Sequence, residues 1–137
     1  MPVLQSGLNK QAAAKQVSSR HDSRPLFAIG HVSMTASDVG GLAAFYAEIG
    51  MRLVVDMGRA AIVELRGGIH LVIHSGEPGR GNLDLIVDDI DATLDTLERA
   101  GAACTSIRRG NPHDQFTATD PEGNALTINS NHAMGPV

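Results

Sequence analysis

The sequence predicts an α+β fold made of two βαβββ units, whose mixed sheets curve around a shared cavity. The main observation is that the order strand, helix and three strands occurs twice, at about 28–74 and 82–130. A unit that recurs in this way indicates a repeated architecture. In addition, the segment Asp-Pro-Glu-Gly-Asn at 120–124 predicts a tight turn between the last two strands, because Pro fixes φ and Gly accepts a positive φ.

The first unit begins with residues 28–36, where apolar residues alternate with small or polar ones, as is typical of a strand. A helix over 39–49 follows, with Ser37 or Asp38 as its N-cap and Gly50 as its end. Three short strands complete the unit, at 51–57, 60–66 and 69–74.

The second unit has the same order after a loop rich in Gly and Pro. Residues 83–87 read as a strand, and a helix over 90–100 is capped by Asp88 or Asp89 and stopped by Gly101. Carboxylates at a helix start favour a structural role, because they accept bonds from free N–H groups and oppose the helix dipole. The remaining strands are expected at 102–107, 113–119 and 125–129.

The length of 137 residues suits a single domain, which we place at 26–137 after a flexible basic tail at 1–25. The tail has four basic residues and one acid, a net charge of +3, whereas 26–137 has seven Arg and fourteen acids, a net charge of −7. An acidic body repels phosphate backbones, so no nucleic-acid partner is expected.

The single cysteine, Cys104, cannot form an internal disulfide and fits a reducing compartment. No apolar run approaches the roughly 20 residues that a membrane-spanning helix needs. We therefore expect a cytoplasmic protein without a membrane partner.

Three segments carry a resemblance to a known family. They are 30–38 (Gly-His-Val-Ser-Met-Thr-Ala-Ser-Asp), 85–92 (Leu-Ile-Val-Asp-Asp-Ile-Asp-Ala), and Phe116 with the turn at 120–124. In this order they resemble the vicinal oxygen chelate superfamily, which includes glyoxalase I, extradiol dioxygenases and bleomycin- or fosfomycin-resistance proteins. The resemblance covers about residues 28–130.

The resemblance implies four positions whose side chains converge on a metal ion in metal-dependent members of the family. Carried over one at a time, they fall on His31, His70, Asn82 and Thr127. The family has His at the third position and Glu at the fourth, so this chain lacks the imidazole of the third position and the negative charge of the fourth, both of which a divalent ion favours. Only His31 matches the three ligands of an extradiol dioxygenase.

The favoured function is therefore binding of a small organic molecule in the cavity, with no cofactor expected. Its ligand-binding residues would be His31, His70, Asn82, Phe116 and Thr127. Short members of the family commonly dimerise, which implies a homodimer.

The alternative is a metal-dependent enzyme of the glyoxalase or dioxygenase type, acting on a substrate with vicinal oxygens. His70 and His74 are four residues apart on one strand, so both lie on one face. With His31 they could hold Zn, Ni, Mn or Fe. Glu64 or a His would then be the catalytic proton acceptor. If Glu64 points inward among aliphatic groups, its pKa is expected to be raised, whereas an outward Glu64 would be solvated.

Overall fold

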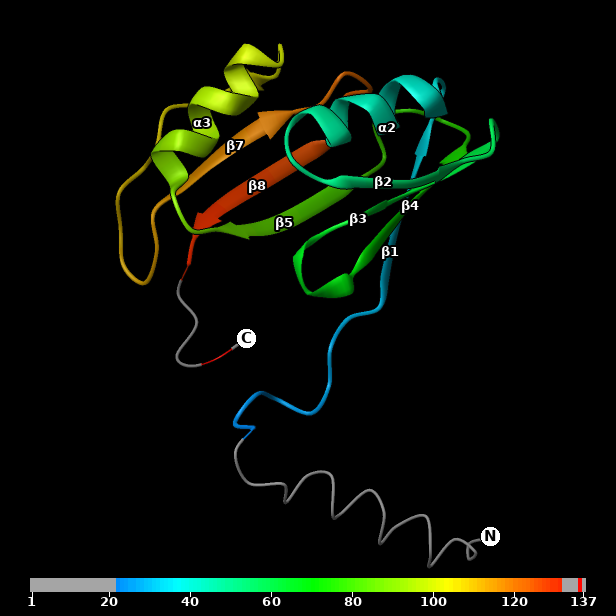
Figure 1. Ribbon diagram of the computed structural model, residues 1–137. Coiled ribbons are helices and arrows are strands. Elements are labelled where there is room, and N and C mark those ends of the chain that lie inside the picture. The colour runs from blue at the N-terminus through cyan, green and yellow to red at the C-terminus, as the bar shows by residue number, and fades with distance from the viewer. Residues whose placement is uncertain (1–21, 132–135, 137) are drawn as a thin grey trace, which may run out of the picture. The chain divides into compact units, whose positions relative to one another are not determined.

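A computed structural model describes residues 22–131 and 136 (Figure 1). Within the chain, Ile29–His132 form one compact unit, and the account below concerns that part. The predicted tail at 1–25 lies for the most part outside the described residues. No helix in the described part of the chain is long and apolar enough to cross a membrane.

The first βαβββ unit forms a four-stranded mixed sheet in the order β1-β4-β3-β2. Strand β1 pairs with β4 in parallel, and the two other pairings are antiparallel. The elements are β1 (His31–Ala36), α2 (Val39–Glu48), β2 (Arg52–Asp56), β3 (Ala60–Glu64), the short 3₁₀ turn η1 (Arg66–Gly68) and β4 (His70–Ser75).

The second unit forms a sheet of the same kind, in the order β5-β8-β7-β6. Its elements are β5 (Asn82–Val87), α3 (Ile90–Arg99), β6 (Ala103–Cys104), β7 (Gln115–Thr119) and β8 (Ala125–Ser130). Both helices lie on one side of the strands (Figure 1). Two four-stranded mixed sheets with two helices confirm the predicted fold class, and the sheets do not close into a barrel.

The predicted strand at 102–107 is wrong in length, since β6 contains only Ala103 and Cys104. The neighbouring Thr105 explains where the strand ends. Its main-chain N–H still bonds the Thr117 carbonyl, but its hydroxyl accepts the bond from the Thr117 N–H. A side chain therefore replaces the main-chain acceptor and ends the regular ladder.

Both helices begin as predicted. Asp38 accepts a bond from the Gly41 N–H in α2, and Asp89 accepts one from the Ala92 N–H in α3. Two neighbouring carboxylates at the start of α3 take part in ion pairs, Asp88 with Arg66 and Asp91 with Arg109.

The two units follow one template, so that their elements can be aligned from the first residue of each. Strand β1 begins at His31 and β5 at Asn82, and the last strands of the two sheet cores, β4 and β8, begin at His70 and Ala125. His31 therefore corresponds to Asn82, and His70 corresponds to Ala125. The helices α2 and α3 align in the same way. This correspondence allows the side chains of the two units to be compared position by position.

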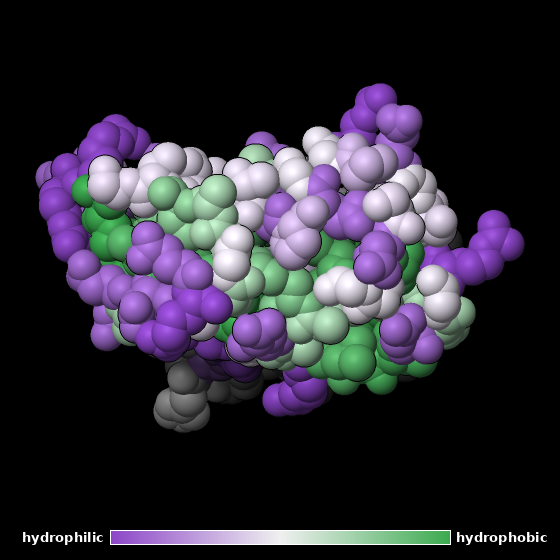
Figure 2. All heavy atoms as spheres, turned by 90° about the horizontal axis from the view of Figure 1, so that it is seen from above, coloured by the Kyte–Doolittle hydropathy of each residue, from purple (hydrophilic) through white to green (hydrophobic). Residues whose placement is uncertain are grey.

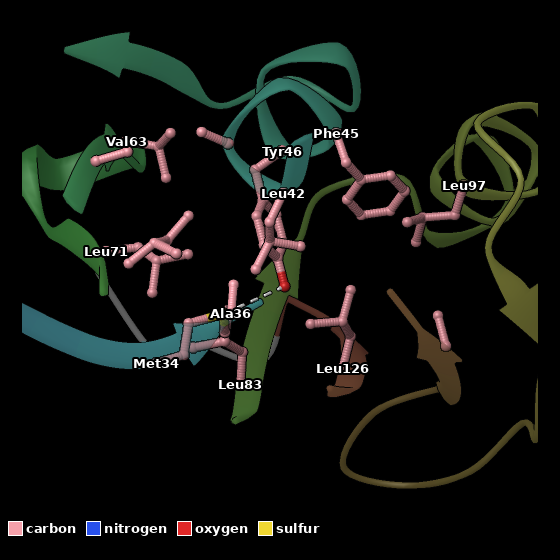
Figure 3. Close-up of a cluster of buried hydrophobic side chains, with 14 of the residues drawn as sticks. Met34, Ala36, Leu42, Phe45, Tyr46, Val63, Leu71, Leu83, Leu97 and Leu126 are labelled. Atoms are coloured by element: carbon pink, nitrogen blue, oxygen red, sulfur yellow. Dashed lines mark hydrogen bonds between the residues drawn. The ribbon is translucent and has the colours of Figure 1, made fainter. Parts of the chain in front are cut away.

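The core is continuous between the units. Leu42 and Tyr46 of α2 lie between Val63 and Leu71 of the first sheet and Leu126 of the second (Figure 3). Several apolar side chains nevertheless remain outside the core. Figure 2, which views the molecule from above, shows apolar surface among polar side chains, and the aliphatic residues of β2 are exposed, namely Leu53, Val54 and Val55.

Polar contacts join the units at the turn between β7 and β8. The Asp120 carboxylate accepts the Tyr46 hydroxyl at 2.6 Å, although both groups are buried. Burial, aided by this bond, raises the pKa of Tyr46 far above its usual range. Glu122 accepts bonds from the N–H groups of Ser37 and Asp38 at the start of α2.

Candidate functional site

One row of four ionisable side chains crosses the whole first sheet. The register pairs Arg52 with Glu64, Glu64 with His70, and His70 with His31, on the successive strands β2, β3, β4 and β1. Side chains at paired positions lie on the same face of a sheet. We call this set the cross-strand row.

Direct contacts link the members of the row. Glu64 Oε2 lies 3.2 Å from an Arg52 guanidinium nitrogen, and Glu64 Oε1 lies 3.0 Å from His70 Nε2. The rings of His70 and His31 meet edge to face, with their centroids 5.8 Å apart. Since a carboxylate only accepts hydrogen bonds, His70 Nε2 carries the proton, and a neutral His70 presents Nδ1 as an acceptor.

The row lies on the face of the sheet opposite the helices, which we call the open face. The neighbouring residues Val63 and Leu71 point the other way and are fully buried. In contrast, the His70 and Glu64 side chains are 31% and 27% exposed, and His31 is exposed. A ligand from solvent can therefore reach both imidazoles.

His74 does not join this group. It shares the open face of β4, but it pairs with Thr35 and lies four residues beyond His70, about 13 Å away at the usual strand rise. A metal ion binds imidazole nitrogens at about 2 Å, so one ion cannot contact both. The three-histidine set predicted from the sequence is therefore wrong, and the described residues contain no group of three His, Cys, Asp or Glu that could hold a metal.

The register also corrects the second family position. Thr127 pairs with Asp84, and Ser33, the counterpart of Asp84 in the first unit, pairs with Val72. The counterpart of Thr127 is therefore Val72, whereas His70 corresponds to Ala125. His70 lies beside His31, but by this register Val72, and not His70, is the counterpart of Thr127.

These four positions do not fit a divalent ion. Their side chains are those of His31, Val72, Asn82 and Thr127, which supply one imidazole, one amide oxygen, one hydroxyl and no charge. Divalent transition metals favour several imidazole, thiolate or carboxylate ligands. The metal chemistry that the family implies in other members therefore has no matching donor set here.

Phe116 lies away from the open faces. Its side chain is 2% exposed and belongs to the hydrophobic core. The neighbouring Gln115 and Thr117 occupy the open face of β7, because successive residues of a strand alternate. Contact between Phe116 and a ligand stays a prediction, and such a ligand would have to enter the core.

The second sheet contains a polar network that the sequence did not reveal. Asn129 donates to Asp84 at 2.5 Å, Gln115 donates to Asn129, and Arg108 donates to Gln115. Asn129 is 2% exposed, so this network satisfies a buried amide. Arg52 was also missed, because its place opposite Glu64 depends on a register with a bulge between Leu53 and Val55.

Two cavities adjoin the first unit. One, of about 180 Å³, lies between the units and is bordered by α3, β5 and the residues after α2. The other, of about 410 Å³, includes Arg52 and Glu64 of the row together with η1. Neither is lined by His31, Asn82 or Thr127, so the shared cavity predicted around these residues stays a prediction.

Comparison with known proteins identifies the class. The family model described as a glyoxalase-like domain matches residues 31–129. The chain therefore belongs to the glyoxalase-like domain family, within the vicinal oxygen chelate superfamily. No curated protein matches the sequence.

Solved structures share the fold across nearly their whole length. The antibiotic-binding protein TnmS3 from Streptomyces sp. CB03234 is 26% identical, with a TM-score of 0.68, and the match covers 78% of this chain and 98% of that chain. The bleomycin-binding protein of Streptomyces verticillus, complexed with copper(II)-bleomycin, is 24% identical, with a TM-score of 0.64 and coverage of 79% and 99%. Lactoylglutathione lyase of Agrobacterium tumefaciens is 19% identical, with a TM-score of 0.68 and coverage of 82% and 100%.

Proposed function

We propose that this protein binds a small organic molecule at the open face of its first sheet, without a metal ion. The observation that carries the proposal is the cross-strand row, in which Arg52 and Glu64 fix the orientation of His70 beside His31. Preorganised hydrogen-bonding groups of this kind are typical of ligand sites. The ligand-binding structures TnmS3 and the bleomycin-binding protein support binding as the general activity.

Each member of the row has a definite role in this proposal. His70 accepts a hydrogen bond from the ligand through Nδ1, and His31 offers its ring edge or a second nitrogen. Glu64 holds the His70 ring in place and is not itself the ligand contact. Asn82 and Thr127 would contact the ligand from the second sheet, and a homodimer is proposed from the family resemblance.

Bleomycin is a suitable first probe, because it is the ligand of one structural neighbour. Titration of the full-length protein by calorimetry should show saturable binding without added metal, and His70→Ala should weaken it at least tenfold. His74→Ala is the matched control, since it removes the same side chain from the same face of β4. Equal losses in both variants, or no binding of metal-free bleomycin, would contradict the proposal for this ligand.

Metal content separates the proposal from the enzymatic alternative. Protein purified without a histidine tag should contain far less than one equivalent of transition metal by elemental analysis. It should also leave the hemithioacetal of methylglyoxal and glutathione unchanged, with or without added zinc, nickel or manganese. A stoichiometric ion that disappears in His31→Ala would favour the metal-dependent enzyme instead.

A further inference from the structure

The cavity of about 180 Å³ between the two units is lined by none of the four residues of the cross-strand row. Its borders include Thr93, Thr96 and Leu97 of α3, together with Leu65 at the end of β3 and Leu85 of β5. Most of these side chains are apolar, and Leu97 is only 1% exposed. One wall of the cavity is therefore formed by a residue of the core.

The internal repeat explains why this cavity exists. We aligned α2 and α3 from their first residues, Val39 and Ile90. In this alignment, the cavity-lining residues of α3 correspond to larger residues of α2. The residues that correspond to Thr93, Thr96 and Leu97 are Leu42, Phe45 and Tyr46. These α2 side chains are buried in the core. At its end of the interface, Tyr46 reaches Asp120 and closes the gap.

At the other end of the interface, the space between α3 and the residue that follows β3 is not filled in this way. Leu65 corresponds to Asp120, because each lies five residues before the first residue of β4 or β8. Neither Leu65 nor Leu97 has a polar group that could form a bond like the one between Tyr46 and Asp120, and both border the cavity. A position that one unit fills with its own side chains is thus left for another occupant.

A basic residue borders this cavity. Arg66 of η1 borders it and also borders the second cavity, where Arg52 lies. Arg66 donates to Asp88 at 2.8 Å, and this ion pair uses one of the five N–H donors of a guanidinium. The remaining donors suit a carboxylate, which arginine binds through two parallel bonds.

We propose that this cavity binds a small aromatic carboxylate about the size of benzoate, with the ring between Leu65, Leu85 and Leu97 and the carboxylate at Arg66. The volume supports a single ring, because an apolar protein cavity of about 150 Å³ binds benzene. The lining of this cavity includes no residue of the cross-strand row, so neither proposal depends on the other.

The test is a titration of the full-length protein with benzoate and with benzene, followed by methyl NMR. Both probes should cause saturable shifts at the methyl groups of Leu65, Leu85 and Leu97, and benzoate should bind more tightly. Absence of saturable shifts at these methyl groups up to the solubility of each probe would overturn the proposal.

Variants assign the site. Thr96→Phe restores the residue type that α2 has at the corresponding position, so it should fill the cavity and abolish binding. Ala92→Phe, which adds the same ring at an exposed position of α3, should leave binding unchanged. Leu65→Phe fills the cavity from the opposite side and replaces Thr96→Phe if that variant does not fold. Full binding in the folded filled variant would overturn the proposal.

The proposed contact between Arg66 and the carboxylate of the ligand is tested by comparing the affinities for benzoate and benzene. Arg66→Ala should weaken benzoate binding roughly tenfold, the loss expected for a charge-assisted contact worth about 1.4 kcal/mol, and leave benzene binding unchanged. If the wild type and Arg66→Ala bind benzoate with equal affinity, the proposed role of Arg66 is overturned. His70→Ala should leave both probes unaffected, which keeps this test distinct from that of the proposed function.

Discussion

The two ends of the interface between the units are built from corresponding elements of the repeat but contain different side chains. At one end, which we call the sealed end, Tyr46 and Asp120 form a buried hydrogen bond. At the other end, which we call the open end, the corresponding residues Leu97 and Leu65 border the cavity of about 180 Å³. The difference shows that the repeat sets the order of strands and helices, whereas single side chains decide whether the interface between the units is filled or leaves a cavity.

The largest expected effect concerns the sealed end. Asp120→Ala should lower the free energy of unfolding by about 3 kcal/mol, because it leaves buried donors without an acceptor. These donors include the Tyr46 hydroxyl, the Asn124 amide and the Asn124 main-chain N–H. Urea unfolding monitored by circular dichroism measures the loss.

The matched variant at the open end is Leu65→Ala. Leu65 is half-buried and already borders a cavity, so its truncation should cost only about 1 kcal/mol. If Leu65→Ala costs as much as Asp120→Ala, the sealed end is not the stronger of the two, and the comparison fails.

An effect of similar size, but dependent on pH, is expected at Glu122, which joins the sealed end to the start of α2. Partial burial raises the pKa of Glu122, but the bonds from Ser37 and Asp38 outweigh it, and the pKa lies below its usual value. A carboxyl group with a lowered folded-state pKa stabilises the protein above its unfolded pKa, and that stability is lost as the pH falls through the folded value. The wild type should therefore lose stability on acidification below about pH 4.5.

Glu122→Gln removes this titration. Its unfolding free energy should be lower than that of the wild type by roughly 1 kcal/mol near neutral pH. The difference should shrink as the pH falls from about 5 to 3. A difference that is constant over this range would show that Glu122 acts through packing and not through its charge.

Much of the fold could be predicted from the sequence because its signals are local. The caps at Asp38 and Asp89 and the turn at 120–124 depend on residues within a few positions of one another, and each was found where expected. The end of β6 could not be predicted, because it depends on a bond between Thr105 and the distant Thr117. Hydrophobic alternation alone gives no information about such a contact.

The site was less predictable, because it depends on register between strands. His31 and Glu64 were singled out as separate candidates, but only the pairing of four strands places them in one row with His70 and Arg52. The alternation along β4 places His74 and His70 on one face, but four residues of a strand separate them by about 13 Å, too far for both to bind one metal ion. The register also decides which residue of β4 corresponds to Thr127. A shift of two residues along β4 changes that residue from Val72 to His70.

The smallest expected effect on stability is at the open end. Arg66→Ala removes the ion pair with Asp88, whose pKa is lowered by the bonds from Asn131 and Arg66. Both side chains are mostly exposed, at 60% and 68%, and such pairs contribute little because water screens them. The free energy of unfolding, measured by urea titration, should therefore equal that of the wild type within experimental error, and any residual difference should vanish in high salt. A clear loss of stability would mean that Arg66 and Asp88 hold the units together, so that the open end would be a second structural junction and not a ligand site.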